Sequence, residues 1–215
     1  GGLTVSSPNG GERWVVNEIH PITWTTGGTV PNVKIDYSTN GFADELETTV
    51  IIASTANAGT YSWTIPDTID NSVKVRVSDV NDSTASDTSN TNFKIEGSVT
   101  LTAPNGGEQC TVNSVRSVTW DRVGSIANVK LEYSTDNGTI YIPISASEPN
   151  TGSYVWTIPD AISGQVLVRV SDATDPEVFD VTNAVFKILA SFPLSPPHGG
   201  GGRLPGRSRR KVAGV

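Results

Sequence analysis

The sequence predicts an all-β protein made of two antiparallel β-sandwiches in tandem. One observation is a duplication, because Trp24 recurs as Trp120 after 96 positions and Trp63 recurs as Trp156 after 93 positions. A second observation is that apolar and polar residues alternate over short stretches, which is typical of strands with one buried face. The third is that Gly, Asn and Pro separate these stretches, as turns do. A repeat of this length matches a whole small domain.

The duplicated landmarks keep their order along the chain. They include the motif Pro-Asn-Gly-Gly-Glu, a Tyr-Ser-Thr triplet, a Trp-Thr-Ile-Pro-Asp stretch, a Val-Arg-Val-Ser-Asp stretch and Phe-Lys-Ile. In residue numbers the first copies begin at Pro8, Tyr37, Trp63, Val75 and Phe93, and the second copies begin at Pro104, Tyr133, Trp156, Val168 and Phe186.

Sixteen strands follow from the alternation, eight in each repeat. Val73, Val75 and Val77 share one face of a strand, for example, while Lys74 and Arg76 take the other. In the first repeat we predict Leu3–Ser6, Arg13–Val16, Pro21–Thr25, Val33–Ser38, Thr49–Ala53, Thr60–Ile65, Val73–Ser78 and Asn92–Glu96. In the second repeat we predict Val99–Ala103, Gln109–Val112, Ser117–Asp121, Val129–Ser134, Ile140–Ile144, Ser153–Ile158, Val166–Ser171 and Val185–Leu189.

No stretch shows the apolar periodicity of a helix, and Phe42–Thr48 predicts at most a short turn. About eight short strands per domain, separated by turn residues, are typical of an immunoglobulin-like or fibronectin-like sandwich. The Pro-Asn-Gly-Gly motif combines a fixed φ with residues that tolerate positive φ. We therefore expect the first strand of each domain to break there and to rejoin the opposite sheet.

The domain boundaries follow from the repeat. We assign one sandwich to residues 1–97 and the other to residues 98–190, with a connection of about three residues around Gly97 that predicts an elongated rod. Residues 191–215 are rich in Pro, Gly and Arg without apolar periodicity, which predicts a disordered basic tail.

Charge restricts the choice of partner. Residues 1–190 carry 22 acidic and 10 basic groups, so their net charge is −12, whereas the remaining 25 residues carry five basic groups and no acid. An acidic body argues against nucleic acid as a partner and against adsorption to anionic membranes. No transmembrane run or leader is recognisable, so the sequence has the character of a mature or excised segment.

The residues needed for catalysis or zinc binding are few. His20 and His198 have no counterparts in the other repeat, and no Ser, Cys or carboxylate is placed to complete a triad with them. Zinc needs three or four closely spaced His or Cys ligands. A pair of glycosidase carboxylates would meet only in space, but nearly every Asp and Glu falls in a turn or on a solvent-facing position. We therefore expect no enzymatic activity and no cofactor.

Calcium is the strongest metal candidate. One Asp-rich loop precedes the last strand of each domain, and such loops can supply the oxygen ligands that calcium prefers. The alternative is that these side chains only cap turns through bonds to the backbone. The residues concerned are Asp79, Asp82 and Asp87 in the first domain and Asp172, Asp175 and Asp180 in the second.

The single cysteine, Cys110, stands where the first repeat has Trp14. We expect it to fill an apolar site, with a reactive or intermolecular thiol as the alternative. The duplicated residues Trp24, Trp63, Trp120 and Trp156 have the strand parity of core side chains.

Three unduplicated aromatic residues are the candidate ligand contacts. Phe42, Tyr141 and Phe179 have no partner at the repeat offset, so they are not required by the shared fold. Scattered exposed aromatic residues are common, which is the structural alternative.

The ordered motif set over about residues 3–189 resembles the Ser-Thr-rich GPI-anchored membrane family domain, found at the N-terminus of yeast cell-wall β-1,6-glucan assembly proteins and in tandem in bacterial and archaeal surface proteins. The resemblance implies an extracellular immunoglobulin-like sandwich and brings no catalytic residues. The sequence departs from the family pattern at Cys110, where a tryptophan is expected, and in residues 42–57, which lack an aromatic hairpin.

The function we expect is that of a non-catalytic spacer or adhesion module in a secreted or cell-surface protein. Its partners would be flanking domains of that protein, a glycan or another surface protein. The alternatives are a carbohydrate-binding accessory module of a secreted hydrolase and, by resemblance, a factor in cell-wall glucan assembly.

Overall fold

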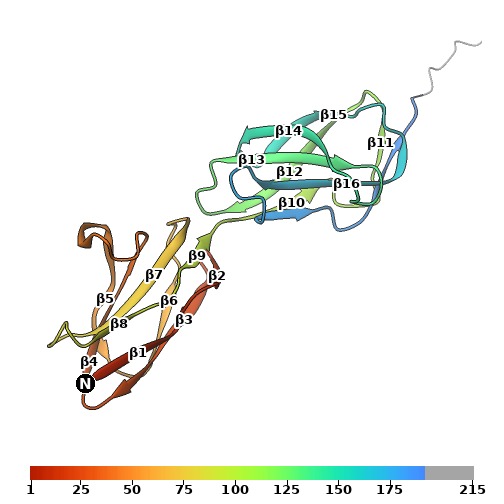
Figure 1. Ribbon diagram of the computed structural model, residues 1–215. Helices are drawn as coiled ribbons and strands as arrows, with labels where there is room; N and C mark the ends of the chain where they lie inside the picture. The colour runs from red at the N-terminus through yellow and green to blue at the C-terminus, as the bar shows by residue number, and fades with distance from the viewer. Residues whose placement is uncertain (192–215) are drawn as a thin grey trace, which may run out of the picture.

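A computed structural model describes residues 1–191, which form two β-sandwiches placed end to end (Figure 1). The first contains β1 (Gly2–Ser7), β2 (Arg13–Val15), β3 (Ile19–Gly27), β4 (Asn32–Ser38), β5 (Thr48–Ala56), β6 (Thr60–Thr64), β7 (Asp70–Asp79), β8 (Ser86–Thr88) and β9 (Phe93–Glu96), with a single 3-10 turn, η1 (Glu45–Glu47). The second contains β10 (Ser98–Ala103), β11 (Gln109–Thr111), β12 (Val115–Val123), β13 (Asn128–Ser134), β14 (Ile142–Pro149), β15 (Ser153–Thr157), β16 (Ser163–Asp172), β17 (Phe179–Val181) and β18 (Phe186–Leu189).

Each sandwich pairs a small sheet with a larger one. In the first sandwich the order is β1-β3-β6 in one sheet and β2-β9-β7-β4-β5 in the other, with β8 paired to the far end of β7. The second sandwich repeats both sheets with β10-β12-β15 and β11-β18-β16-β13-β14, where β17 takes the place of β8. The predicted all-β class and the immunoglobulin-like or fibronectin-like tandem are confirmed, and all sixteen predicted strands are present with shifted ends.

The strand switch predicted at Pro-Asn-Gly-Gly is also confirmed. β1 pairs antiparallel with β3, and after the turn β2 pairs parallel with β9 in the other sheet. The carboxylate of Glu12 stabilises the turn because it accepts hydrogen bonds from the backbone N–H groups of Asn9 and Gly10, both at 2.7 Å. Gly10 has φ of +131°, and a Cβ there would lie 1.6 Å from Oγ1 of Thr91, so only glycine fits.

The repeated tryptophans lie in the two hydrophobic cores, as predicted. Trp24, Trp63, Trp120 and Trp156 are all buried. Two of them also satisfy their indole N–H groups in the same manner, because Nε1 of Trp24 and of Trp120 donates at 2.7 Å to an asparagine side chain, that of Asn57 or Asn150. The corresponding asparagine amides donate in turn to the backbone oxygens of Val30 and Ile126.

Only Gly97 separates β9 from β10, and the two sandwiches meet at this point. A Cβ on Gly97 would lie 2.6 Å from the backbone oxygen of Val123 and 2.7 Å from Ile126, so the chain passes too close for any side chain. Ile69 packs against both cores, and Val123 of the second sandwich packs against the first core. The predicted basic tail, residues 191–215, lies outside the described residues except for Ser191.

Candidate functional site

The outer face of the larger sheet carries a buried carboxylate in the first sandwich. Asp36 of β4 is fully buried, although it lies on the side of the sheet away from the core. It accepts a bidentate pair of hydrogen bonds from Arg76 of β7, at 3.1 Å from Nε and 2.9 Å from Nη2, and Nζ of Lys34 lies 2.8 Å away. Both cations satisfy the carboxylate, as burial of a charge requires.

The second sandwich repeats this arrangement with a longer acid. Glu132 of β13 accepts hydrogen bonds from Arg169 of β16 at 3.0 and 2.6 Å, and Nζ of Lys130 lies 2.6 Å from its other oxygen. Burial alone would raise the pKa of the Glu132 carboxyl, but the hydrogen bonds and charges of Lys130 and Arg169 outweigh it and hold that pKa below its ordinary value. Both ion-pair groups are therefore structural parts of the sheet face.

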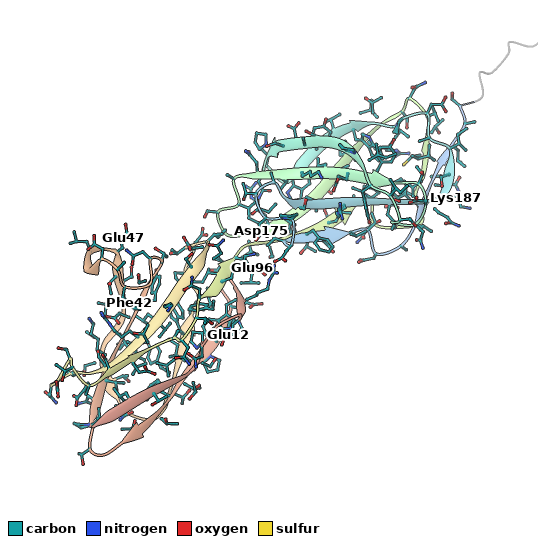
Figure 2. All side chains as sticks on the ribbon, in the orientation of Figure 1. Glu12, Phe42, Glu47, Glu96, Asp175 and Lys187 are labelled. Atoms are coloured by element: carbon teal, nitrogen blue, oxygen red, sulfur yellow. The ribbon has the colours of Figure 1, made fainter. Side chains whose placement is uncertain are left out.

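The three aromatic candidates lie over these arginines. The ring of Phe42 stacks on Arg76 with its centroid 4.3 Å from the guanidinium carbon, and Tyr141 stacks on Arg169 at 4.0 Å. The Phe179 ring centroid lies 5.9 Å from the guanidinium carbon of Arg169, and this side chain is 52% exposed. Phe42 lies on the loop between β4 and β5, as Figure 2 shows.

Phe42 and Tyr141 are thus counterparts in space, which corrects the premise that they are unduplicated. They are 99 positions apart in the sequence, whereas the arginines they cover are 93 apart, so alignment at the repeat offset does not reveal the pair. Of the three candidates, Phe179 presents the largest free surface.

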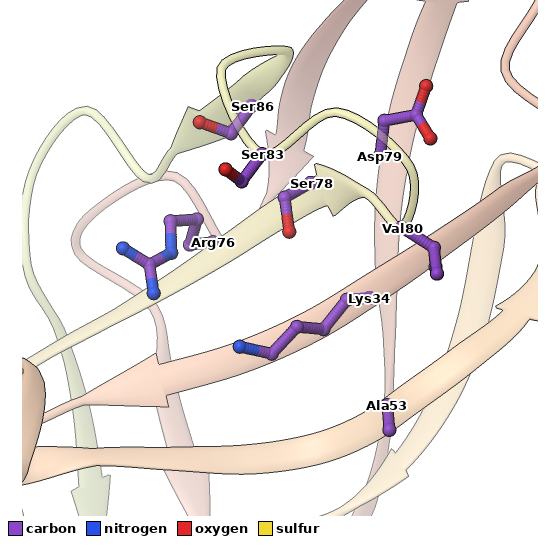
Figure 3. A pocket seen from close by; sticks show the side chains of 8 residues that line it. All are labelled: Lys34, Ala53, Arg76, Ser78, Asp79, Val80, Ser83 and Ser86. Atoms are coloured by element: carbon purple, nitrogen blue, oxygen red, sulfur yellow. The ribbon is translucent and has the colours of Figure 1, made fainter.

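A groove in the first sandwich occupies the position that Phe179 fills in the second. Ser86 lies opposite Ser78 in the β7–β8 pair, and Phe179 lies opposite Ser171 in the matching pair. The groove has a volume of about 520 Å³. Figure 3 shows Lys34 and Arg76 extending from neighbouring strands below the side chains of Ser83 and Ser86. Its remaining lining residues are Ala53, Ser78, Asp79 and Val80.

The Asp-rich loops use their carboxylates to fix backbone. Asp79, Asp82 and Asp172 accept hydrogen bonds from backbone N–H groups two residues later, at 2.8–3.1 Å. Asp87 and Asp180 instead accept from the N–H groups of Val5 and Leu101, both at 2.7 Å, so they tie the first strand of each sandwich to the neighbouring sheet. The turn-capping interpretation is confirmed for the first three and for Asp175, which accepts from the N–H of Glu177 at 3.3 Å. The described residues contain no group of three or more His, Cys, Asp or Glu suited to a metal ion.

Asp175 belongs to the junction between the sandwiches. Its carboxylate pairs with Nζ of Lys94, which also lies 3.1 Å from Glu96. Figure 2 places Glu96 and Asp175 where the two sandwiches meet. Burial lowers the pKa of Lys94, but hydrogen bonds to Asp175 and Glu96 outweigh that effect and raise it.

Further polar contacts surround this pair. Arg13 of β2 bridges Glu96 of its own sandwich and Glu177 of the other. The side chain of Asp67 accepts hydrogen bonds from the backbone N–H and the hydroxyl of Ser125, at 2.9 and 3.0 Å. The junction is therefore held by polar contacts as well as by the packing of Ile69.

The residues considered for catalysis lie apart. The ring of His20 stacks on Trp14 at 4.7 Å and contacts Glu18, whereas Cys110 is buried in the other sandwich with a free thiol. His198 lies outside the described residues. No helix within residues 1–191 has the length and apolarity to cross a bilayer.

No family model and no curated protein matches the chain. Among solved structures, the fibronectin(III)-like modules of Clostridium thermocellum CbhA are 20% identical, with coverage of 87% of this chain and 94% of that chain and a TM-score of 0.30. The titin domains z1z2 solved with telethonin are 12% identical, with coverage of 88% of this chain and 98% of that chain and a TM-score of 0.30. The N-terminal four Ig domains of Dscam1 are 9% identical, with coverage of 88% of this chain and 46% of that chain and a TM-score of 0.38. These similarities transfer no function to the chain.

Proposed function

We propose that this chain is a non-catalytic extracellular spacer and adhesion module of a secreted or cell-surface protein. The observation that carries the proposal is the junction between the sandwiches, where a one-residue connector, shared packing of Ile69 and the Lys94–Asp175 and Arg13–Glu177 pairs act together. Two domains joined by a long free linker would tumble independently. A module that holds its neighbours at a fixed distance needs the opposite property.

The backbone around the junction supports a stiff unit. Val16 N–H donates to the backbone oxygen of Glu96, so the last strand of the first sandwich is fixed up to the connector. Gly124 of the second sandwich approaches Val16 and Asp67 of the first, where a Cβ would lie within 3.3 Å of both. In this role the flanking domains of the longer protein are the partners, and the module determines their separation.

Rotational diffusion measured by ¹⁵N relaxation tests the spacer role. We expect one anisotropic tensor to describe both sandwiches. A matched control carries a six-residue Gly-Ser insertion after Gly97, which should give each sandwich its own shorter correlation time. If the parent chain behaves like the insertion variant, the spacer proposal fails. Adhesion is tested separately by retention of beads coated with the chain on protein-coated and glycan-coated surfaces.

We propose carbohydrate binding as the second candidate, because Phe179 presents an exposed ring on the outer sheet face. An exposed ring can take up the apolar face of a sugar, and the neighbouring Arg169 can donate hydrogen bonds. A glycan array compares the parent with Phe179→Ala, Phe42→Ala and Tyr141→Ala. We expect Phe179→Ala to lose most of the signal, and the absence of any binding by the parent would reject this candidate.

A further inference from the structure

The two sandwiches differ at one core position that the repeat makes directly comparable. Trp14 of β2 lies opposite Ile95 of β9, and Cys110 of β11 lies opposite Ile188 of β18 in the same parallel register. The first sandwich therefore has an indole where the second has a thiol. The next strand differs as well, since His20 of β3 corresponds to Arg116 of β12.

In the first sandwich the Trp14 ring is the centre of an aromatic cluster. It stacks on His20 with the ring centroids 4.7 Å apart and the planes within 4°. Its other neighbours are Phe93 at 5.1 Å and Trp63 at 6.1 Å, the latter in an edge contact. A flat ring thus occupies a slot that is closed by His20 on its outer side.

In the second sandwich the ring is missing and one wall differs, because Arg116, which interacts with the Cys110 thiol, stands in place of His20. Trp156 and Ile158 correspond to Trp63 and Ile65, and Pro104 corresponds to Pro8. Cys110 is buried at 3% exposure but is much smaller than an indole, and a hollow of about 190 Å³ remains beside it. The hollow is lined by Ala103, Pro104, Glu108, Cys110, Arg116, Ser117, Trp156 and Ile158.

The chemistry of the lining defines the ligand. Pro104, Trp156 and Ile158 make most of the surface apolar, and apolar surface around unfilled space forfeits dispersion contacts. The two charged residues, Glu108 and Arg116, have opposite signs, so the hollow has no net charge to attract an ion. An engineered apolar cavity of about 150 Å³ in another protein binds benzene, a ligand of this kind.

We propose that the second sandwich binds a small, neutral, planar aromatic molecule in this hollow, in the place that the Trp14 indole fills in the first sandwich. Such a site is independent of the spacer role and of the outer sheet face. With indole as the probe we expect a dissociation constant of about 0.1–1 mM, because so small a ligand offers few contacts.

The only cysteine of the chain makes the site easy to monitor. Burial raises the pKa of the Cys110 thiol, so alkylation with iodoacetamide is followed at alkaline pH. A ring bound in the hollow covers the thiol, and indole at about ten times its dissociation constant should slow alkylation roughly tenfold. An alkylation rate unchanged by indole would overturn the proposal.

Isothermal titration with indole on three variants separates a site in the hollow from non-specific binding. Cys110→Ala keeps the space and should bind indole like the parent. Cys110→Trp fills the space and should bind none. If Cys110→Trp does not fold, the double variant Cys110→Trp with Arg116→His is used in its place, because it recreates the Trp14–His20 pair of the first sandwich. Binding that persists when the hollow is filled would overturn the proposal.

The first sandwich supplies the matched control. Trp14→Cys combined with His20→Arg should open the same hollow there and raise the stoichiometry of indole binding from one to two. A stoichiometry that stays at one in this folded variant would show that the hollow is not what binds indole.

Discussion

The guanidinium of Arg169 is held between two different partners, with the Glu132 carboxylate at 2.6 Å and the Tyr141 ring 4.0 Å above it. The carboxylate fixes the plane of the guanidinium through two N–H groups, and the ring shields the ion pair from solvent. Arg76 has the same two kinds of partner in Asp36 and Phe42. The aromatic residues on this face are therefore partly committed to the fold.

Replacing Glu132 with Gln should destabilise the second sandwich by about 1–3 kcal/mol at pH 7, because two charge-assisted hydrogen bonds become weaker. The folded-state pKa of Glu132 is lowered, so its contribution is complete above the unfolded value of about 4.3 and is lost as the pH falls through the folded value. Urea unfolding at pH 7 and pH 3 should show the difference between parent and variant shrinking in acid. Asp160→Asn, at an exposed position, is the control and should change the stability at pH 7 by at most about 0.5 kcal/mol. A difference that does not change with pH would contradict this assignment.

The two asparagines that accept hydrogen bonds from the indole N–H groups should contribute unequally to stability. Asn150→Ala leaves the buried Nε1 of Trp120 without a partner and should cost about 1–3 kcal/mol. Asn57→Ala should cost less, because the Trp24–Asn57 hydrogen bond is only partly buried. Thermal unfolding of both variants checks the order, and equal losses would count against burial as the cause.

The junction should loosen when its ion pairs are removed. Burial raises the pKa of Asp175, but the pairing with Lys94 outweighs burial and lowers that pKa. The Asp175–Lys94 ion pair is therefore intact at a pH above the ordinary aspartate pKa of about 3.9, and it weakens as the pH falls through the folded-state pKa. Lys94→Gln combined with Arg13→Gln should weaken the junction at neutral pH, as acid does in the parent. Small-angle scattering should record a broader distance distribution, with Lys187→Gln as the control at an exposed site. An unchanged distribution would assign the stiffness to the contacts that remain, which are the packing of Ile69, the close approach at Gly97 and the Asp67–Ser125 hydrogen bonds.

Thr48 offers a stabilising substitution. Its hydroxyl is buried without a hydrogen-bond partner, which is unfavourable for a polar group. Thr48→Val removes the hydroxyl at nearly constant volume and should raise the stability of the first sandwich by about 1 kcal/mol. Thr49→Val, at an exposed neighbouring position, is the comparison in chemical denaturation. A loss of stability at position 48 would indicate an unrecognised partner for the hydroxyl.

The sequence predicts the elements that have an apolar face and misses those that do not. β8 and β17 were not predicted, because Ser86–Thr88 has no alternation and Phe179–Val181 is too short to show any. These strands form because the long β7 and β16 offer a free edge and because Asp87 and Asp180 bond across to the first strands. Neither cause can be seen in the sequence of β8 or β17 itself.

The candidate site was predicted only in part for a similar reason. Aromatic residues could be selected by their absence from the repeat, but their stacking on Arg76 and Arg169 depends on loops of different length. The pair of Lys94 and Asp175 joins residues 81 positions apart on different domains, which no periodicity encodes. Cys110 occupies an apolar core site, as its alignment with Trp14 predicted, but the smaller side chain leaves a hollow that the alignment alone does not show.

The parallel pairing of β2 with β9 determines how each sandwich would carry a mechanical load. Tension between the chain ends pulls β2 by its start and β9 by its end, so the two strands slide along each other. The bonds between them, including Lys94 N–H to Glu12 at 2.9 Å and Val16 N–H to Glu96 at 3.0 Å, then resist together and do not open one after another. The second sandwich has the equivalent bonds, from Lys187 to Glu108 and from Val112 to Leu189. Both sandwiches are thus loaded in shear, so several hydrogen bonds must break together before either sandwich opens.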